Sequence, residues 1–370
     1  MRLKLTISML SIAVFAVCSQ AANATTAGAV YTLSNSSSGN AVLVYNRSAT
    51  GQLTPGGSFS TGGMGSGAGL ASQGALALDS SNRFLFVVNA GSNTVSVFEV
   101  MQNGLHLVGT TSSGGENPVS VTSFGRILYV LNEGGAVGGV DTIAGFEVNA
   151  TGQLQMISHG IGLSAASVAP AQVSFNPEGN LLIVTEKNTN KIDIFSLNDA
   201  GVPMKRSIIN SAGETPYGFA FGRRDQLFVS DAVGGAAGAG AMSSYFVSTD
   251  GTAHTLDGLA NDNQSAPCWV ALTGDGRLLY TINSASGTVS GYGISYIGQL
   301  QLLSPNGVAA SLGTTSAPID AAISNDSSFL YVLAPGTGMI DGFTVGVNGA
   351  LTPDAQVSNI PASASGLAVR

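Results

Sequence analysis

A chain of 370 residues with a formal net charge of −8 and only 9% charged residues offers little basic surface, which argues against a nucleic-acid-binding protein. Its 50 glycines, together with many Ser, Thr and Asn residues, are typical of a fold with many turns. Only Cys268 of the two cysteines follows the N-terminal 24 residues, so the rest of the chain has no internal disulfide.

Residues 1–24 have the pattern of a signal peptide. Arg2 and Lys4 provide a positive start, residues 5–17 are apolar, and Ala22-Asn23-Ala24 is a small-residue cleavage site. The apolar run is too short for a spanning helix, and no later segment is long and apolar enough. A lipoprotein modified at Cys18 is the alternative, although the preceding residues fit a lipidation box poorly. We therefore expect residues 25–370 to form a secreted or periplasmic protein.

One short unit recurs along the remaining chain. It consists of a Leu, an aromatic or β-branched residue, a short apolar run and then Asn, Asp or Glu. In the copy at residues 85–89, turn residues follow, and residues 94–100 then alternate between apolar and polar. This pattern predicts two antiparallel strands. The second residues of the seven copies lie 43 to 55 apart, at positions 31, 86, 129, 183, 228, 280 and 331.

A period near 50 built of short strands is typical of a β-propeller with about four strands per blade. We predict an all-β fold, a seven-bladed β-propeller with four-stranded antiparallel blades. The first blade comprises residues 29–34, 41–46 and 52–60. The other six are expected at about residues 74–115, 119–159, 172–211, 217–259, 269–311 and 320–358.

The first blade lacks the strand that precedes the repeated unit in the other blades. Residues 365–370 resemble those preceding strands, for example residues 74–78 and 269–272. We therefore expect the C-terminal strand to join the first blade and close the ring. Closure in this way removes two open sheet edges that would otherwise favour aggregation.

Candidate functional residues cluster in two kinds of loop. In a propeller, the loop leading into each innermost strand and the loop after the repeated unit lie on one face, around the central channel. This face is predicted to be polar and mildly acidic. We predict catalytic roles for Glu133, Glu186 and Lys187, and ligand binding by Gln172, Tyr217, Asp231, Trp269 and Asp320. Structural alternatives are turn capping by Asp, a surface ion pair for Lys187, and packing between blades for Trp269.

Other catalytic constellations are not indicated. His106, His159 and His254 lie far apart and make neither a zinc spacing nor a triad. Three Gly-rich segments, residues 62–69, 134–139 and 234–240, lack the lysine of a phosphate-binding loop. Cys268 is expected to fill a small buried space. We expect no cofactor and no metal.

Residues 125–133 (GRILYVLNE) and 176–184 (NPEGNLLIV) resemble the repeats of the seven-bladed lactonase family, and residues 94–98 and 191–195 match its following strand. The repeated units also resemble the repeat named YVTN after its residues Tyr-Val-Thr-Asn. This family includes bacterial 6-phosphogluconolactonase and fungal carboxy-cis,cis-muconate cyclases. The resemblance implies catalytic His, Arg and Glu side chains on the channel face. Here the expected His positions hold Pro118, Gln172 and Trp269, the Arg position holds Ala171, and only Glu133 is retained.

Two functions follow from this comparison. The missing His and Arg favour a scaffold that binds a small polar ligand, a sugar lactone or an extracellular protein on the channel face. The family resemblance favours the alternative, a 6-phosphogluconolactonase-like lactone hydrolase or a muconate cyclase-like enzyme. We expect a monomer.

Overall fold

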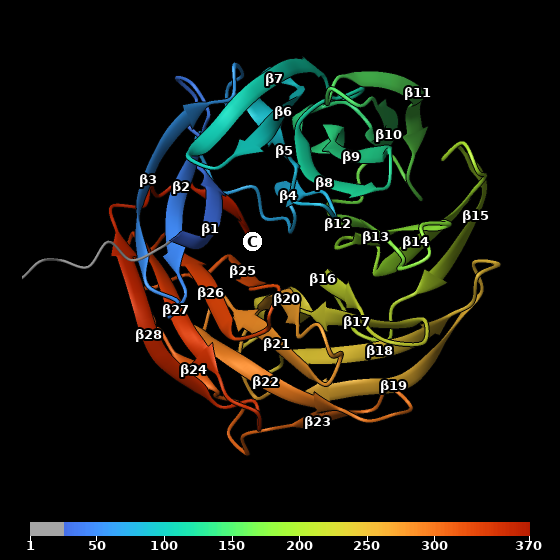
Figure 1. The fold of residues 1–370 in the computed structure, drawn as a ribbon. Coiled ribbons are helices and arrows are strands. Elements are labelled where there is room, and N and C mark those ends of the chain that lie inside the picture. Colours follow the sequence, from blue (N-terminus) through green and yellow to red (C-terminus); the bar gives the residue numbers. More distant parts are fainter. Residues whose placement is uncertain (1–25) are drawn as a thin grey trace, which may run out of the picture.

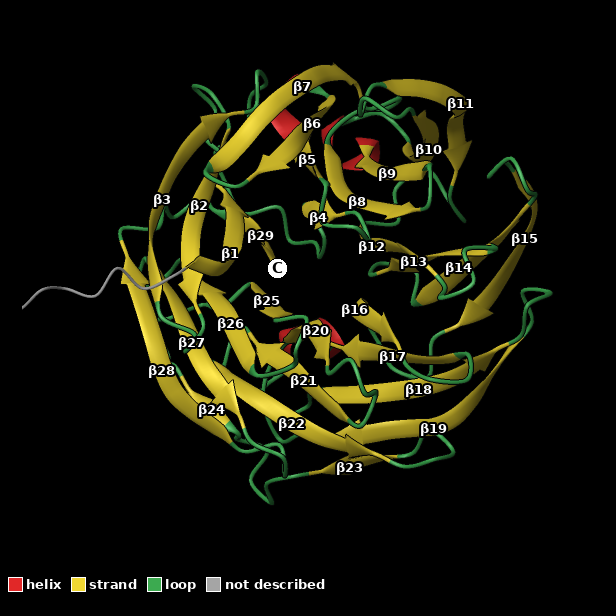
Figure 2. Cartoon of the chain, in the orientation of Figure 1, coloured by secondary structure: helices red, strands yellow, loops and turns green. Residues whose placement is uncertain are grey.

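The computed structural model describes residues 26–370, which form seven antiparallel sheets in a ring around a central channel (Figure 1). The predicted all-β, seven-bladed propeller is confirmed. Helical structure in these residues is limited to three short 3₁₀ turns between strands (Figure 2), namely η1 (Ala90–Ser92), η2 (Gly134–Val137) and η3 (Val233–Gly235). Residues 1–24, predicted to be a signal peptide, lie outside the described residues.

The blades follow one another along the chain, and each runs from an innermost to an outermost strand. From the channel outward, their strands are β29 (Ser365–Val369), β1 (Thr26–Leu33), β2 (Ala41–Ser48) and β3 (Leu53–Ser60) in blade one; β4 (Leu76–Leu78), β5 (Phe84–Asn89), β6 (Thr94–Met101) and β7 (Gly104–Ser112) in blade two; β8 (Pro118–Phe124), β9 (Ile127–Glu133), β10 (Asp141–Val148) and β11 (Leu154–Gly162) in blade three; β12 (Pro170–Phe175), β13 (Leu181–Glu186), β14 (Lys191–Leu197) and β15 (Pro203–Asn210) in blade four; β16 (Pro216–Phe221), β17 (Gln226–Asp231), β18 (Ala241–Val247) and β19 (Ala253–Asn261) in blade five; β20 (Pro267–Leu272), β21 (Leu278–Asn283), β22 (Thr288–Ile294) and β23 (Leu300–Leu302), with β24 (Ala310–Ser311) also paired to β22, in blade six; and β25 (Asp320–Ile323), β26 (Phe329–Ala334), β27 (Met339–Val345) and β28 (Leu351–Ser358) in blade seven.

The C-terminal strand closes the ring, as predicted. Strand β29 pairs with β1 so that Val369 lies opposite Val30 and Ala368 lies opposite Tyr31. Blade one is therefore built from both ends of the described chain. Strand β1 thereby has the inner partner that it would lack in a sheet of β1, β2 and β3 alone.

The repeated unit forms the second strand of each blade, which is the most buried. Every residue of β5, β13, β17 and β26 is buried, because neighbouring blades cover both faces of these strands. The outermost strands, such as β3 and β15, are mostly exposed or half-buried. The apolar core therefore lies between the blades, around the second and third strands.

A tyrosine of the repeated unit links several blades to the next. The Tyr129 hydroxyl donates to the Gly201 carbonyl at 2.7 Å. Equivalent bonds join Tyr280 to Gly349 at 2.9 Å and Tyr331 to Gly51 at 2.7 Å. Each acceptor glycine lies in the turn before an outermost strand of the following blade. The last of these bonds joins blade seven to blade one, so it supports ring closure together with β29.

The lead-in to β4 crosses the central channel, and we call residues 70–74 the channel segment. Its main chain meets blades on the opposite side of the ring: the Gln73 N–H donates to the Ala171 carbonyl at 2.9 Å, and Trp269 Nε1 donates to the Ser72 carbonyl at 2.9 Å. The side chain of Gln73 donates to the Val270 carbonyl at 2.8 Å. Blades two, four and six are thereby joined across the channel.

None of the helices among residues 26–370 has the length and hydropathy needed to cross a membrane.

Candidate functional site

Proline begins the innermost strand of four consecutive blades. Strands β8, β12, β16 and β20 start at Pro118, Pro170, Pro216 and Pro267. The preceding residues, Asn117, Ala169, Thr215 and Ala266, have φ of 52°, 51°, 56° and 55°. Non-glycine residues rarely adopt this left-handed conformation, and such strain tends to gather at functional sites. We call the side of the ring where these prolines lie the proline face.

Glu133 and Lys187 form an ion pair on the proline face. Glu133 ends β9 in blade three, and Lys187 follows β13 in blade four. Lys187 Nζ lies 4.0 Å from Glu133 Oε1, and the two side chains are only 12% and 14% exposed. Lys187 Nζ also donates to the Ala71 carbonyl of the channel segment at 2.8 Å. The pair therefore lies where blades three and four meet the channel.

Partial burial changes the proton affinity of both groups. Burial raises the pKa of Glu133, and the charge of Lys187 opposes this increase while Asp141 adds to it. Burial likewise lowers the pKa of Lys187, and Glu133 opposes that decrease. A carboxylate with a raised pKa and an amine with a lowered pKa are the changes that suit a general base and a nearby cation near neutral pH.

Asp141 fixes the loop after Glu133. Asp141 Oδ1 accepts from the Gly135 N–H at 2.7 Å, and Oδ2 accepts from the Val168 N–H at 2.6 Å. These bonds tie η2, which follows Glu133, to the lead-in of β12. The fully buried carboxylate of Asp141 thus fixes the loop that positions Glu133.

Tyr217 and Trp269 form an aromatic wall beside Lys187. Lys187 Nζ lies 4.9 Å from the centre of the Tyr217 ring, a cation–π distance, and the Tyr217 and Trp269 rings are 5.2 Å apart. Cys268 is buried next to them, and burial raises the pKa of its thiol to about 12. That shift favours the inert thiol over the thiolate.

Glu186 lies apart from this pair although it precedes Lys187 in the sequence. Its side chain is fully buried, and its carboxylate accepts from the Ser164 N–H at 2.9 Å and from the hydroxyl groups of Ser164 and Thr189. Glu186, the last residue of β13, bonds Ser164 between blades three and four, whereas Lys187, which follows the strand, reaches Ala71 of the channel segment. The carboxylate contacts Ser164 in the lead-in to β12.

Gln172 and Asp320 join neighbouring innermost strands. Gln172 Oε1 accepts from the Phe219 N–H at 2.7 Å, which links blade four to blade five. Asp320 Oδ2 accepts from the Leu367 N–H at 3.0 Å, which links blade seven to β29. Asp320 is fully enclosed, and burial raises the pKa of its carboxyl well above the usual range. Both side chains therefore lie in the channel wall, apart from the Glu133–Lys187 pair.

Asp231 is buried at the end of β17. One carboxylate oxygen accepts from the Ser211 hydroxyl at 3.2 Å, and the other has no hydrogen-bond partner within residues 26–370. Burial raises the pKa of Asp231 to about 7.

Of the eight predicted site residues, the structure brings Glu133, Lys187, Tyr217 and Trp269 together. Among the described residues, no three His, Cys, Asp or Glu side chains form a metal-binding group.

Comparisons with known proteins agree with this architecture. The family model described as lactonase, 7-bladed beta-propeller, matches residues 22–133 and 119–221. The chain belongs to the seven-bladed lactonase family. No curated protein matches the sequence of this lactonase-family chain.

Solved structures share the fold of this lactonase-family chain at low sequence identity. The periplasmic gluconolactonase of Pseudomonas aeruginosa has a TM-score of 0.70 at 18% identity, covering 92% of this chain and 99% of its own. A candidate 6-phosphogluconolactonase of Bacteroides fragilis has a TM-score of 0.68 at 19% identity, covering 94% and 99%. A Lactobacillus plantarum protein has a TM-score of 0.71 at 17% identity, covering 93% and 99%.

Sequence inspection missed the channel segment. Ala71, whose φ is 51°, takes the place of the residue before proline in the other lead-in loops, and Ser72 takes the place of the proline. Aligning the residues that precede each repeated unit would have shown this correspondence. It would not have shown that the segment reaches Lys187 and Trp269 across the channel, because those contacts depend on the closed ring.

Proposed function

We propose that this lactonase-family protein hydrolyses the ring of a small sugar lactone on its proline face. The observation that carries the proposal is the half-buried Glu133–Lys187 pair, whose charged atoms lie 4.0 Å apart at the channel. Ester-like hydrolysis needs a base for water and a positive group for the oxyanion, and the pair provides one of each. The gluconolactonase and 6-phosphogluconolactonase relatives support sugar lactones as the substrate class.

In this mechanism Glu133 takes a proton from water as the water oxygen bonds to the ring carbonyl carbon. The carbonyl electron pair moves to its oxygen, and the Lys187 ammonium stabilises that negative charge. When the ring C–O bond breaks, Glu133 returns the proton to the leaving oxygen and an open-chain hydroxy acid is released. Tyr217 and Trp269, both buried, pack against each other beside Lys187, and the Tyr217 ring holds the ammonium group at a cation–π distance.

The experiment is a panel of sugar lactones, with and without a phosphate group, in which acid release by the purified chain is followed in a pH-stat. Spontaneous opening is subtracted. We expect turnover above background, and a decrease of about 10²–10⁴-fold in Glu133→Gln, the usual contribution of a general base. Lys187→Met should also lose most of the activity.

A matched control comes from Arg126 and Glu147, an exposed ion pair in blade three between the β8–β9 turn and β10. Glu147→Gln changes the same functional group as Glu133→Gln and should keep full activity. Absence of turnover on every lactone, or equal turnover in Glu133→Gln, would refute the hydrolase proposal.

A binding protein for a small polar ligand is the second candidate. One observation favours it: the Lys187 ammonium group already donates a hydrogen bond to the Ala71 carbonyl of the channel segment. A ligand bound without turnover, and released in both Glu133→Gln and Lys187→Met, would support this candidate over hydrolysis.

We also propose that residues 1–24 direct export and are then removed, and that the product is a secreted or periplasmic monomer. The positive start, apolar core and cleavage site support export, as does the periplasmic relative. Mass spectrometry of the N-terminus and sedimentation of the exported protein test this. An N-terminus at Met1, or a dimer, would contradict it.

A further inference from the structure

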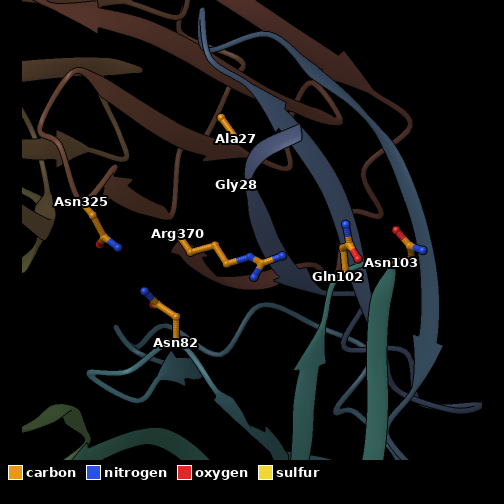
Figure 3. Close-up of a pocket in the computed structure, with 7 residues that line it drawn as sticks. All are labelled: Ala27, Gly28, Asn82, Gln102, Asn103, Asn325 and Arg370. Atoms are coloured by element: carbon orange, nitrogen blue, oxygen red, sulfur yellow. The ribbon is translucent and has the colours of Figure 1, made fainter. Parts of the chain in front are cut away.

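A polar cavity lies on the opposite face of the ring from the Glu133–Lys187 pair. Its volume is about 730 Å³, within the range typical of small-molecule sites. It is lined by residues of blades one, two and seven: Ala27, Gly28, Asn82, Gln102, Asn103, Asn325 and Arg370 (Figure 3). Asn82 and Asn325 also line a neighbouring cavity of about 530 Å³.

The lining residues come from turns and strand ends that the ring brings together. Asn82 lies in the turn between β4 and β5, Gln102 and Asn103 lie in the turn between β6 and β7, and Asn325 lies in the turn between β25 and β26. Arg370 follows β29, and its N–H donates to the Ala29 carbonyl at 3.0 Å. The cavity therefore exists only in the closed ring, because β29 places Arg370 between blades two and seven.

Most of the residues that line the cavity carry the same functional group. Four carry carboxamides, and none of these four carboxamides has a hydrogen bond to another residue in the range 26–370. Gln102, Asn103 and Asn325 are exposed and Asn82 is half-buried, so these carboxamides are open to solvent and to a ligand. Carboxamides each offer two donors and an acceptor, which matches the hydroxyl groups of a sugar or polyol.

One guanidinium group, that of Arg370, lines the cavity and gives it a positive charge. Figure 3 shows the Arg370 side chain extending from the side of Asn82 and Asn325 toward Gln102. Arg370 Nε is buried without a partner in the described chain. Arg47 lies behind it and donates through Nη2 to the Arg370 carbonyl at 3.2 Å. Within residues 26–370, neither arginine has an Asp or Glu carboxylate within 4.0 Å.

No acidic side chain lines the cavity that contains Arg370. Asp326, next to Asn325, interacts instead with Arg47: against the effect of burial, hydrogen bonds and the charge of Arg47 lower the pKa of its carboxyl. Asp79 lines the neighbouring cavity, but its Oδ1 accepts from the main-chain N–H groups of Arg83 and Phe84, both at 2.7 Å. A buried guanidinium nitrogen without a partner and free carboxamides around it favour an anionic, hydroxylated ligand over a neutral apolar one.

Gly28 makes room for this arrangement. A Cβ at Gly28 would collide with the Arg370 carbonyl and come within 2.9 Å of Arg47 Nη2. The lack of a side chain at this position therefore allows the two arginines to approach the cavity wall.

We propose that this cavity is a second binding site, for a sugar acid of monosaccharide size. The carboxylate bonds the Arg370 guanidinium, and the hydroxyl groups bond the carboxamides of Asn82, Asn325, Gln102 and Asn103. This site is separate from the proline face and does not depend on lactone hydrolysis there.

The test is calorimetric titration of the purified chain with D-glucuronate, D-glucose, acetate and inorganic phosphate up to about 10 mM, a range that covers millimolar affinities. We expect glucuronate to bind, and glucose, acetate and phosphate to bind at least about tenfold more weakly, since each lacks one half of the recognition. Phosphate or acetate binding as tight as glucuronate binding would overturn the proposal, as would no glucuronate binding.

Variants locate the site. Arg370→Gln should weaken glucuronate binding about tenfold or more, the value of one charge-assisted hydrogen bond. Gln102→Ala should weaken it less, whereas Gln301→Ala, an exposed glutamine of β23, serves as a control without effect. Lys187→Met on the proline face should leave it unchanged. Binding that persists in both Arg370→Gln and Gln102→Ala, or is lost in Lys187→Met, would refute a site on this face.

Discussion

The side chain of Gln73 occupies the space that Gly218 leaves open in the channel wall. Gln73 Oε1 accepts from the Val270 N–H at 3.1 Å. The corresponding N–H groups of Val173 and Phe219 are bonded by Ser120 at 3.2 Å and Gln172 at 2.7 Å, side chains of the preceding innermost strand. Blade five has Gly218 at that position, so the channel segment provides the missing acceptor.

Gly218→Ala tests this fit. The added Cβ would collide with Gln73 Oε1 and lie 2.6 Å from the Cys268 carbonyl, so we expect destabilisation of roughly 1–3 kcal/mol. Urea unfolding followed by fluorescence measures it. Gly258→Ala is the control, because no atom lies within 4 Å of its new Cβ. Equal stability of the two variants would mean that Gln73 does not need this space.

The pH dependence of lactone hydrolysis tests the Glu133–Lys187 pair. Glu133 must be ionised to act as a base, so kcat/KM should rise with pH through its raised pKa and fall when Lys187 loses its proton. In Lys187→Met the charge that opposes the increase in the Glu133 pKa is gone. The acidic limb should therefore move to higher pH, and the alkaline limb should disappear. A residual profile with unchanged limbs would argue against coupling between the two groups.

Asp231 should make the fold less stable as pH rises. Its pKa is raised from 3.8 to about 7 by burial, so between these values the folded state holds a proton that the unfolded state has released. The stability that this protonation provides is therefore full below about pH 4 and is lost as pH rises to 7, by roughly 4 kcal/mol. Asp231→Asn should reduce this slope in denaturant titrations between about pH 4 and 7.

Asp199→Asn, at an exposed aspartate in the turn before β15, is the control for Asp231→Asn and should retain the wild-type slope. If Asp231→Asn retains it as well, the pH dependence belongs to another group. Asp193 is the next to test, since burial raises its pKa to about 7 and both of its oxygens lack a hydrogen bond within the described residues.

Removal of residues 365–370 should open blade one. Strand β29 contributes the buried residues Leu367 and Val369 and pairs with Val30 and Tyr31 of β1. We expect the unfolding midpoint to fall by about 10 °C or more and aggregation to increase, because the innermost edge of β1 becomes free. Calorimetry and light scattering measure both. A synthetic peptide of residues 363–370 should restore part of the stability, and no effect of the deletion would contradict closure by β29.

The repeated unit made the ring predictable because each copy shows the same short apolar run, and residues 365–370 matched the strand that blade one lacked. The site was less predictable. Glu186 and Lys187 are adjacent, and whether each faces the channel depends on the register of β13 to one residue. The channel segment can be aligned with the other lead-in loops, but its position across the channel depends on Lys187, Gly218 and Trp269 far along the chain.

The pairing of β29 with β1 also constrains when the molecule can be completed. Blade one lacks its innermost strand until residues 365–369 have been synthesised, which happens after the strands of the other six blades have been synthesised. The propeller ring of a nascent chain therefore stays open until β29 is available, and the cavity around Arg370 is among the last features to form. Such late assembly suits a protein that we propose is threaded through a translocation pore before it folds.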